Sequence, residues 1–324
     1  MGRPIVIAAI AALVSVIGLA RSASAAPPPR PSIEVGDPGP NGVRIDRDGV
    51  FANFYPARDK GRGPAVLLLG GSEGGLHAGG GGMVKGLVAE GFSVLYICYF
   101  GCPGTPPQMV AVPLETFDRA LAFLRTQPIV NPKQIAVVGG SKGGEAALLI
   151  GTRDRRLKAV VAGMPSSVVW PGIGDSATFT ESSWTAGGAP LPFLPYAFGS
   201  FAKGGIFGLY NDALPNLPQH PDAVIPVERI AKSILLVCGE ADSLWPSCPM
   251  ADQISDRLKS KGRPAAIVLR YKDAGHAVFG APTDKTSPNY AALANFGGTA
   301  EGNAAARADG WPKVISFLNA AVRP

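Results

Sequence analysis

The sequence predicts an α/β fold in which a mostly parallel sheet is covered by helices on both faces. Short uninterrupted apolar runs, at 65–69, 135–138 and 234–238, have the length of strands and alternate along the chain with segments of helical periodicity. Strands that are apolar at every position are typical of parallel sheets buried on both faces. The composition agrees, because 46% of the 324 residues are hydrophobic and only 17% are charged, which favours a large core.

The expected elements follow this alternation from one end of the chain to the other. Strands are predicted at 50–55, 65–69, 92–99, 135–138, 157–162, 233–238 and 265–271, and helices at 83–90, 113–126, 145–150, 249–261 and 304–319. The clearest helix is 113–126, because its apolar residues fall on one face and Pro113 stands at its start. Since α/β folds of this size often form one unit, residues 61–324 are expected to be a single domain.

The first 60 residues are expected to lie outside that domain. Residues 1–25 have the features of a signal peptide, with a positive Arg3, an apolar run at 5–20 and a small-x-small cleavage site at 23–25. The run is shorter than the ~20 residues that span a bilayer, so we expect no stable membrane span after cleavage; an uncleaved anchor is the alternative. Residues 26–60 are expected to be an irregular lead-in with one short strand. The protein is therefore predicted to be periplasmic or extracellular.

Charge and cysteine content restrict the partners and cofactors. The net charge of +6 is spread along the chain without a basic run, which does not predict a nucleic-acid partner. The four cysteines fit an exported protein with disulfides, and the close pairs Cys98/Cys102 and Cys238/Cys248 are the obvious candidates, although the sequence leaves the connectivity and free thiols open. These spacings, without an interleaved histidine, are poor for zinc, so no metal is expected.

Two segments match the motif G-x-S-x-G, which presents a nucleophilic serine on a tight turn between a strand and a helix. They are residues 70–74 (GGSEG) and 139–143 (GGSKG). Ser72 precedes a glycine-rich stretch that cannot begin a stable helix, because each glycine costs about 1 kcal/mol. Ser141 follows an expected strand and precedes a helix-forming run, so Ser141 is the candidate nucleophile. Neither segment has the spacing of a P-loop or a dinucleotide motif, and no cofactor is expected.

A serine hydroxyl needs a neighbouring base, and the base needs a third group to orient it. Of the three histidines, only His276 follows a late strand, at the edge of the sheet where parallel α/β folds bind ligands. His77 lies in a glycine-rich loop and His220 in a proline-rich stretch. We therefore predict that His276 is the base.

The acid is expected between the serine and the histidine in chain order. Asp242 lies there, shortly after the strand at 233–238. Glu240 is nearer the strand end, and Asp273 is only three residues from the histidine, so both are alternatives. A turn or helix cap is the other role open to Asp242.

An oxyanion hole is expected beside the serine, to bind the negative charge that develops on the substrate carbonyl oxygen. Its first donor would be the N–H of Lys142, and its second the N–H of Ser72 or Glu73, in the glycine-rich loop after an early strand. One such donor typically stabilises the transition state by roughly 3–4 kcal/mol. The two G-x-S-x-G segments thus receive different roles.

Residues 165–229 interrupt the alternation of strands and helices. The stretch is rich in Pro and Gly and holds many aromatic residues, among them Trp170 and Trp184. Aromatic content argues against disorder, and long irregular stretches in compact domains are usually lids or binding insertions. We expect an apolar cap over the site, with Trp170 and Trp184 as examples of residues that could contact the substrate. The alternative is an excursion that only packs on the sheet.

The segment 139–145 (GGSKGGE) resembles the S-K-G-x-E elbow of the C-terminal domain family of acyl-CoA thioester hydrolases and bile acid-CoA:amino acid N-acyltransferases. Further matching segments, spread over roughly residues 60–320, are 99–101 (YFG) with 103–104 (PG), 225–229 (IPVER), 242–247 (DSLWPS) and 296–299 (FGGT) with Trp311. The resemblance implies an α/β-hydrolase fold, a triad of Ser141, Asp242 and His276, and acyl thioester chemistry through an acyl-enzyme.

Two departures from the family pattern shape the functional hypothesis. Family members often carry an N-terminal β-sandwich domain, for which the lead-in at 26–60 is too short. The acyltransferase branch has Cys at the elbow, so Ser141 favours transfer to water. We expect an exported serine hydrolase acting on a small-molecule acyl thioester or carboxylic ester, since an exported enzyme would not normally meet CoA. The alternatives are a dienelactone-hydrolase-like esterase, although those enzymes usually use Cys, and a catalytically silent binding protein.

Overall fold

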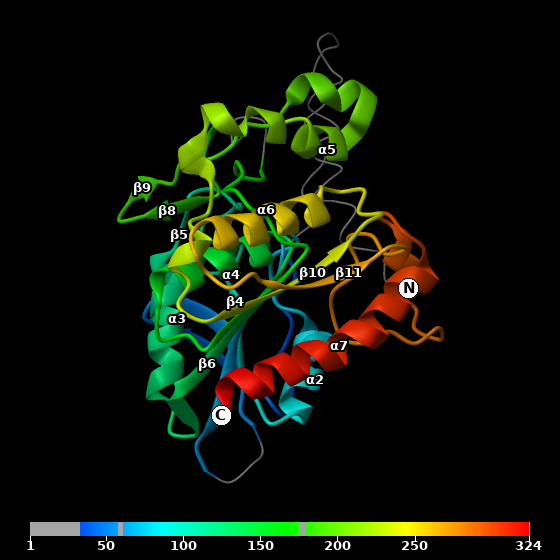
Figure 1. Cartoon of the computed structure of the whole chain (residues 1–324). Helices are drawn as coiled ribbons and strands as arrows, with labels where there is room; N and C mark the ends of the chain where they lie inside the picture. The colour runs from blue at the N-terminus through cyan, green and yellow to red at the C-terminus, as the bar shows by residue number, and fades with distance from the viewer. Residues whose placement is uncertain (1–32, 58–60, 175–178, 324) are drawn as a thin grey trace, which may run out of the picture.

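The main sheet has eight strands in the order β1-β2-β4-β3-β6-β7-β10-β11 (Figure 1). The computed structural model describes residues 33–57, 61–174 and 179–323, so the predicted signal peptide at 1–25 lies outside the described residues. The strands are β1 (Val43–Arg47), β2 (Val50–Tyr55), β3 (Gly63–Leu69), β4 (Ser93–Cys98), β6 (Val130–Gly140), β7 (Ala159–Gly163), β10 (Ser233–Gly239) and β11 (Ile267–Tyr271). Strands β1, β2 and β4 pair antiparallel, and the remaining pairs are parallel.

Helices cover both faces of this sheet, as the alternating pattern predicts (Figure 1). One face carries α3 (Glu115–Thr126), α4 (Lys142–Arg153) and α6 (Ser247–Ser260), and the other carries α2 (Gly81–Ala89) and α7 (Ala300–Val322). Neighbouring residues of one strand supply the two cores, since Val137 packs with the first group and Val138 with the second. The prediction of a mostly parallel sheet with helices on both faces is confirmed.

The lead-in segment is more regular than expected. Residues 43–47, expected to be irregular, form β1, which pairs with β2 in a two-residue hairpin. Asp48 and Gly49 both have left-handed backbones, with φ of 53° and 69°, as a hairpin turn of this length requires. Pro113 is also placed differently: it lies in the short strand β5 (Val112–Pro113), and α3 begins two residues later.

The insertion contains short elements rather than one helical layer. Strands β8 (Trp184–Ala186) and β9 (Ala189–Pro190) join β5 in a three-stranded sheet, and α5 (Phe201–Asn211) follows, at the top of the view in Figure 1. Its aromatic side chains pack on one another: Trp170 stacks on Tyr196 and meets Tyr210 edge-on, with ring centroids 5.9 and 4.9 Å apart. Aromatic packing therefore orders a segment that has little repeating structure.

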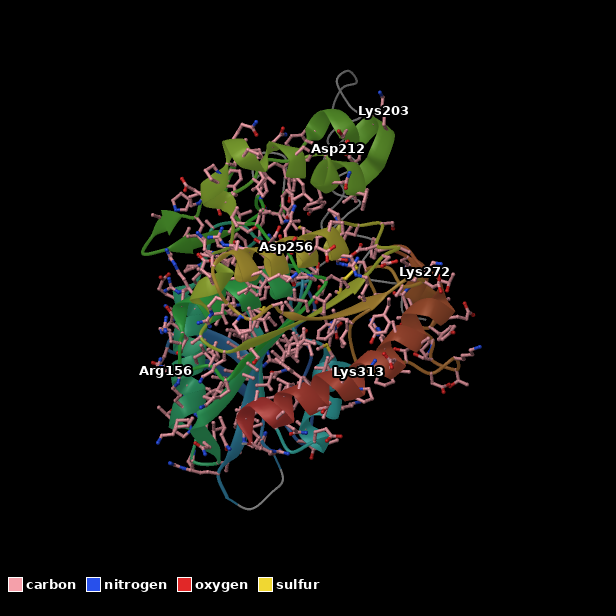
Figure 2. The ribbon with its side chains drawn as sticks, viewed as in Figure 1. Arg156, Lys203, Asp212, Asp256, Lys272 and Lys313 are labelled. Atoms are coloured by element: carbon pink, nitrogen blue, oxygen red, sulfur yellow. A yellow bond between two sulfur atoms is a disulfide. The ribbon has the colours of Figure 1, made fainter. Side chains whose placement is uncertain are left out.

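Short 3₁₀ helices complete the described chain. They are η1 (Ala78–Gly80), η3 (Phe198–Ser200), η4 (Leu214–Gln219), η5 (Pro221–Ala223), η6 (Val227–Arg229) and η7 (Ala291–Ala294). No helix within residues 33–57, 61–174 and 179–323 is long and apolar enough to cross a bilayer. Charged side chains extend outward from several different elements, as the labels in Figure 2 show for Arg156, Lys203, Asp212, Asp256, Lys272 and Lys313.

The four cysteines form the two disulfides that the spacing favours. Cys98–Cys102 follows β4, and Cys238–Cys248 joins the end of β10 to the first turn of α6. All four residues are buried. Each disulfide therefore closes a loop at the carboxyl end of a strand in the main sheet.

Candidate active site

Ser141 lies at the carboxyl end of β6, on the turn that leads into α4. Its backbone has φ 56° and ψ −125°, a left-handed conformation that a residue with a side chain rarely adopts. The flanking glycines allow this turn because the chain passes very close to them. A Cβ atom on Gly139 would lie 2.0 Å from the carbonyl oxygen of Gly143, and one on Gly143 would lie 2.2 Å from that of Gly70.

The three residues proposed as a triad lie within hydrogen-bonding distance of one another. His276, in the loop after β11, places Nε2 2.9 Å from the Ser141 Oγ. Its Nδ1 lies 2.9 Å from Oδ2 of Asp242 and 3.1 Å from Oδ1. An Nδ1–H that donates to the carboxylate leaves Nε2 free to accept the Ser141 proton. Both the histidine and the aspartate are buried, which excludes water from the interaction between them.

Asp242 makes the contacts expected for both of the roles considered for it. Besides facing His276, its Oδ1 accepts the backbone N–H groups of Leu244 and Trp245, at 3.0 and 3.3 Å. The carboxylate therefore also closes the turn after β10, which fixes the position from which it meets the imidazole.

The alternative residues lie elsewhere. Glu240 is exposed and faces Arg270 at 3.6 Å, and Asp273 is exposed as well. His77 is exposed and stacks on Tyr96, with ring centroids 6.2 Å apart. His220 lies between two 3₁₀ turns of the insertion.

A short segment before α7 joins the acid loop to the histidine loop. The Phe296 carbonyl accepts the N–H groups of both Ser243 and His276, at 3.2 and 3.0 Å. Gly297 must lack a side chain, because a Cβ atom there would lie 1.9 Å from the carbonyl oxygen of Ala241. Residues 296–299 match the family pattern, but no residue type among them predicts this role. Every residue has a backbone carbonyl, so the residue type does not show which carbonyl has this role.

The glycine-rich loop after β3 lies against the serine, and Gly71 makes the closest approach. A Cβ atom on Gly71 would lie 3.1 Å from the Ser141 Cβ. The Tyr99 hydroxyl donates to the carbonyl oxygens of Gly70 and Gly71, at 2.7 and 3.1 Å, and the Gly71 N–H donates to Glu73 Oε1 at 2.8 Å. Burial, followed by the nearby Glu73 carboxylate, raises the pKa of Tyr99, which keeps its hydroxyl proton available for these bonds.

Two of the expected oxyanion donors, Ser72 and Glu73, belong to this loop, and the third, Lys142, follows Ser141. Lys142 is the first residue of α4, where a helix leaves its N–H groups without an intrahelical partner. Gly71, which is not among the expected donors, is the loop residue whose added Cβ atom would contact Ser141. Whether the second donor comes from Ser72 or Glu73 stays a prediction.

Trp170 and Trp184, the tryptophans considered as substrate contacts, are fully buried. Trp184 packs against Tyr99 and Phe117, with ring centroids 5.8 and 6.0 Å apart, and Trp170 packs within the insertion. In this structure both contact protein, so neither provides an open binding surface. Within the described residues, no three His, Cys, Asp or Glu side chains are grouped to hold a metal ion.

The sheet order and the serine turn define the α/β-hydrolase fold, and solved structures agree. A puromycin-hydrolysing peptidase from Mycobacterium tuberculosis matches 87% of this chain and 40% of its own, with a TM-score of 0.57 and 18% identity. A dienelactone hydrolase from Klebsiella pneumoniae matches 86% of this chain and 96% of its own, with a TM-score of 0.50 and 14% identity. At these identities the likeness shows the fold alone.

The family is narrower than the fold. Residues 112–324 match the family model described as BAAT / acyl-CoA thioester hydrolase C terminal, and the chain belongs to this family. Mouse acyl-coenzyme A thioesterase 1 is 27% identical over 87% of this chain, and rat acyl-coenzyme A amino acid N-acyltransferase 2 is 29% identical over 74% of it. The chain covers 65% and 55% of the length of these relatives.

Proposed function

We propose that this chain is an exported serine hydrolase that cleaves an acyl thioester or carboxylic ester through an acyl-enzyme on Ser141. The observation that carries the proposal is the continuous line of contacts from Ser141 through His276 to Asp242, at a serine held in a strained turn. The relatives named acyl-coenzyme A thioesterases support an acyl thioester as the substrate class.

The acylation step follows from the positions of these side chains. As the Ser141 Oγ bonds to the acyl carbon, its proton passes to His276 Nε2, and the substrate carbonyl oxygen becomes negative. The N–H of Lys142 and an N–H of the 70–73 loop would bind that oxygen. When the carbon–sulfur or carbon–oxygen bond breaks, His276 gives the proton to the leaving thiolate or alkoxide.

Deacylation repeats the sequence with water. His276 takes a proton from water, the resulting hydroxide attacks the acyl carbon, and the Ser141 Oγ leaves with a proton from the histidine. The Asp242 carboxylate stabilises the imidazolium that forms in both steps, and its own bonds to the 244–245 backbone keep it in place. The products are a carboxylic acid and the free thiol or alcohol.

Two features of the chain support export. Residues 1–25 have the composition of a signal peptide. Two disulfides support the same conclusion, because disulfides persist mainly in oxidising compartments. Because the compartment favours simple esters and the family favours thioesters, both classes of substrate are tested.

The test uses the purified full chain with p-nitrophenyl acyl esters and acyl-CoAs of matched acyl length. We expect Ser141→Ala and His276→Ala each to lower kcat at least about a thousandfold. His77→Ala, which changes an exposed histidine outside the proposed machinery, should retain activity. Undiminished turnover by Ser141→Ala would exclude the acyl-enzyme. Folded wild-type protein that turns over no substrate and is not labelled by a fluorophosphonate would instead indicate a binding protein.

A further inference from the structure

A buried ion pair lies immediately behind the proposed nucleophile. The Lys142 and Glu145 side chains are 1% and 0% exposed, and Nζ lies 2.5 Å from Oε2. Burial raises the pKa of Glu145 and lowers that of Lys142, while the attraction between the two charges opposes both shifts. Since charged groups are rarely buried without a partner, each of these residues depends on the other.

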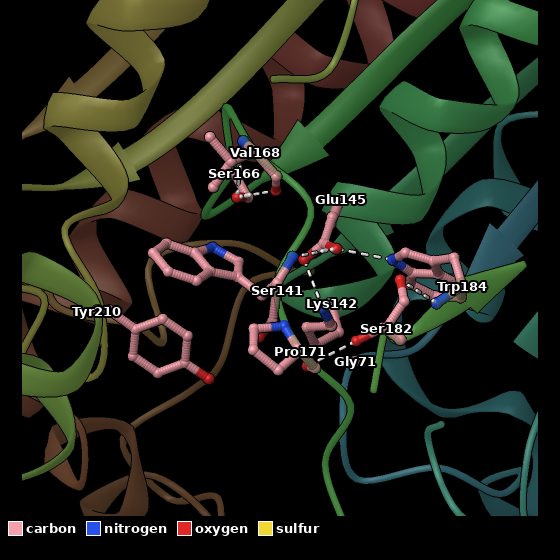
Figure 3. A network of polar contacts seen from close by, with 12 residues as sticks. Gly71, Ser141, Lys142, Glu145, Ser166, Val168, Pro171, Ser182, Trp184 and Tyr210 are labelled. Carbon is pink, nitrogen blue, oxygen red and sulfur yellow. Dashed lines mark hydrogen bonds and ion pairs between the residues drawn. The ribbon is translucent and has the colours of Figure 1, made fainter. Parts of the chain in front are cut away.

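The second carboxylate oxygen of Glu145 contacts the insertion (Figure 3). Its Oε1 accepts the indole N–H of Trp184 at 2.7 Å and the backbone N–H of Trp170 at 3.2 Å. Lys142 Nζ also lies 5.5 Å from the centre of the Trp184 ring, which allows a cation–π contact. One carboxylate thus joins the first turn of α4 to two separate parts of residues 165–229.

This position matters because of the backbone group that Lys142 carries. Its N–H is the expected first oxyanion donor, and the side-chain pair closes the helical turn in which that N–H lies. Strained turns such as that of Ser141 persist only where the surrounding structure fixes them. A carboxylate in the first turn also lies favourably at the positive end of the helix.

The same carboxylate is connected to the histidine through packed aromatic rings. Trp170 meets Tyr210 with ring centroids 4.9 Å apart, Tyr210 meets Trp245 at 5.4 Å, and Trp245 meets His276 at 5.6 Å. All three contacts are edge-to-face. A shift of the Trp170 backbone would therefore be transmitted to the ring that takes the serine proton.

We propose that Glu145 is a positioning residue for the reaction. Through Lys142 and Trp184 it fixes the oxyanion donor. Through Trp170 it fixes the row of aromatic rings, Trp170, Tyr210 and Trp245, that supports His276. This inference rests on the proposed function, because it concerns the geometry of the same site. Glu145 is behind the serine turn and, in this account, touches neither substrate nor the reacting atoms.

The experiment compares Glu145→Gln with the double variant Lys142→Met/Glu145→Leu in the full chain. The single variant keeps an oxygen that can accept the two tryptophan N–H groups but leaves the lysine charge buried without its partner. The double variant removes both charges and the acceptor oxygen, and it keeps the Lys142 backbone N–H. The matched control is Asp154→Asn at the other end of α4, where Asp154 is 8% exposed and pairs with Arg125 at 2.6 Å. Along the helix axis, Glu145 and Asp154 are about 14 Å apart.

The measurements are made per functional site, which separates positioning from loss of folded protein. Sites are counted by fluorophosphonate labelling, and kcat and KM are measured with a p-nitrophenyl acyl ester. We expect both Glu145 variants to lose roughly 10- to 100-fold in kcat per labelled site, with KM within about threefold of wild type. The Ki of an alkyl trifluoromethyl ketone, which forms a tetrahedral adduct, should rise by the same factor. Asp154→Asn should retain its kcat per site.

Two results would overturn the inference in different ways. If wild-type Ser141 reacts but the double variant keeps the wild-type kcat per labelled site and the wild-type Ki, Glu145 has only a structural role and the proposed function stands. If wild-type Ser141 neither reacts with the fluorophosphonate nor supports turnover, the proposed function fails and the inference fails with it.

Discussion

Removal of the Cys238–Cys248 disulfide should destabilise the protein and disturb the proposed site together. The bond joins β10 to α6 across a separation of 10 residues, and Asp242 lies inside the closed loop. The perturbation is the double variant Cys238→Ala/Cys248→Ala. Both cysteines are almost fully buried, at 0% and 2% exposed, so the variant removes packing as well as the crosslink.

The size of the effect follows from the length of the loop. In the chain-entropy model, a crosslink that closes 10 residues contributes roughly 2.7 kcal/mol to the free energy of unfolding. For a domain of this size, that loss lowers Tm by roughly 4–5 °C. Because the loop that carries Asp242 would lose its covalent restraint and keep only its hydrogen bonds, kcat should fall as well, with little change in KM.

The assay is urea denaturation together with kcat per fluorophosphonate-labelled site. The comparison is Cys98→Ala/Cys102→Ala, which opens a loop with a separation of 4 and should cost roughly 1.9 kcal/mol by the same relation. The longer loop should therefore give the larger loss of stability. Equal losses for the two variants, or an unchanged kcat without Cys238–Cys248, would refute the reasoning.

Two further substitutions test the packing of the turn and the surface charges. Gly143→Ala places a Cβ atom 2.2 Å from the Gly70 carbonyl oxygen, so it should displace the oxyanion loop and lower kcat at least about tenfold. The control is Gly204→Ala, at an exposed position where an added Cβ atom meets nothing within 4 Å. Arg257 donates hydrogen bonds of 2.6 and 2.8 Å to the Glu228 carboxylate and holds the pKa of that carboxyl below its usual range. The stability that this ion pair contributes is therefore fully present above the carboxyl pKa of the unfolded chain. It is lost as the pH falls through the carboxyl pKa of the folded protein. Glu228→Gln should therefore destabilise by about 1 kcal/mol at pH 7 and converge with wild type once the pH is below the folded carboxyl pKa. A difference in stability that is constant with pH would contradict this explanation.

Local signals indicate most of the residues whose side chains face one another at the site. The helix that follows Ser141 distinguishes it from Ser72, and the strand that precedes His276 distinguishes it from the other two histidines. Asp242 and Glu240 follow the same strand, so these signals leave both open as the acid. Each of these signals lies within a few residues of the position it marks. The carboxyl ends of parallel strands meet at one edge of a sheet, so the fold class itself brings the three loops together.

The remaining parts of the site depend on contacts that the sequence does not record. The Phe296 carbonyl and the close approach of Gly71 are properties of the backbone, which no residue type reveals. Glu145 reads as an ordinary helix former until the structure places two tryptophans, 25 and 39 residues away in sequence, on its carboxylate. The hairpin at β1, in contrast, has a local signal in the sequence, because Asp48-Gly49 is typical of a two-residue turn. The Pro and Gly residues around it favoured an irregular segment instead.

The two disulfides connect the compartment of the protein to the geometry of its site. Cys98–Cys102 follows β4 and encloses Tyr99, whose hydroxyl holds the carbonyls of Gly70 and Gly71 beside Ser141. Cys238–Cys248 encloses the loop that carries Asp242. No cysteine takes part in the proposed chemistry, yet the crosslinks restrain the loops on both sides of the serine. A reducing compartment would remove both restraints at once, so the proposed export and the proposed catalysis support each other on physical grounds.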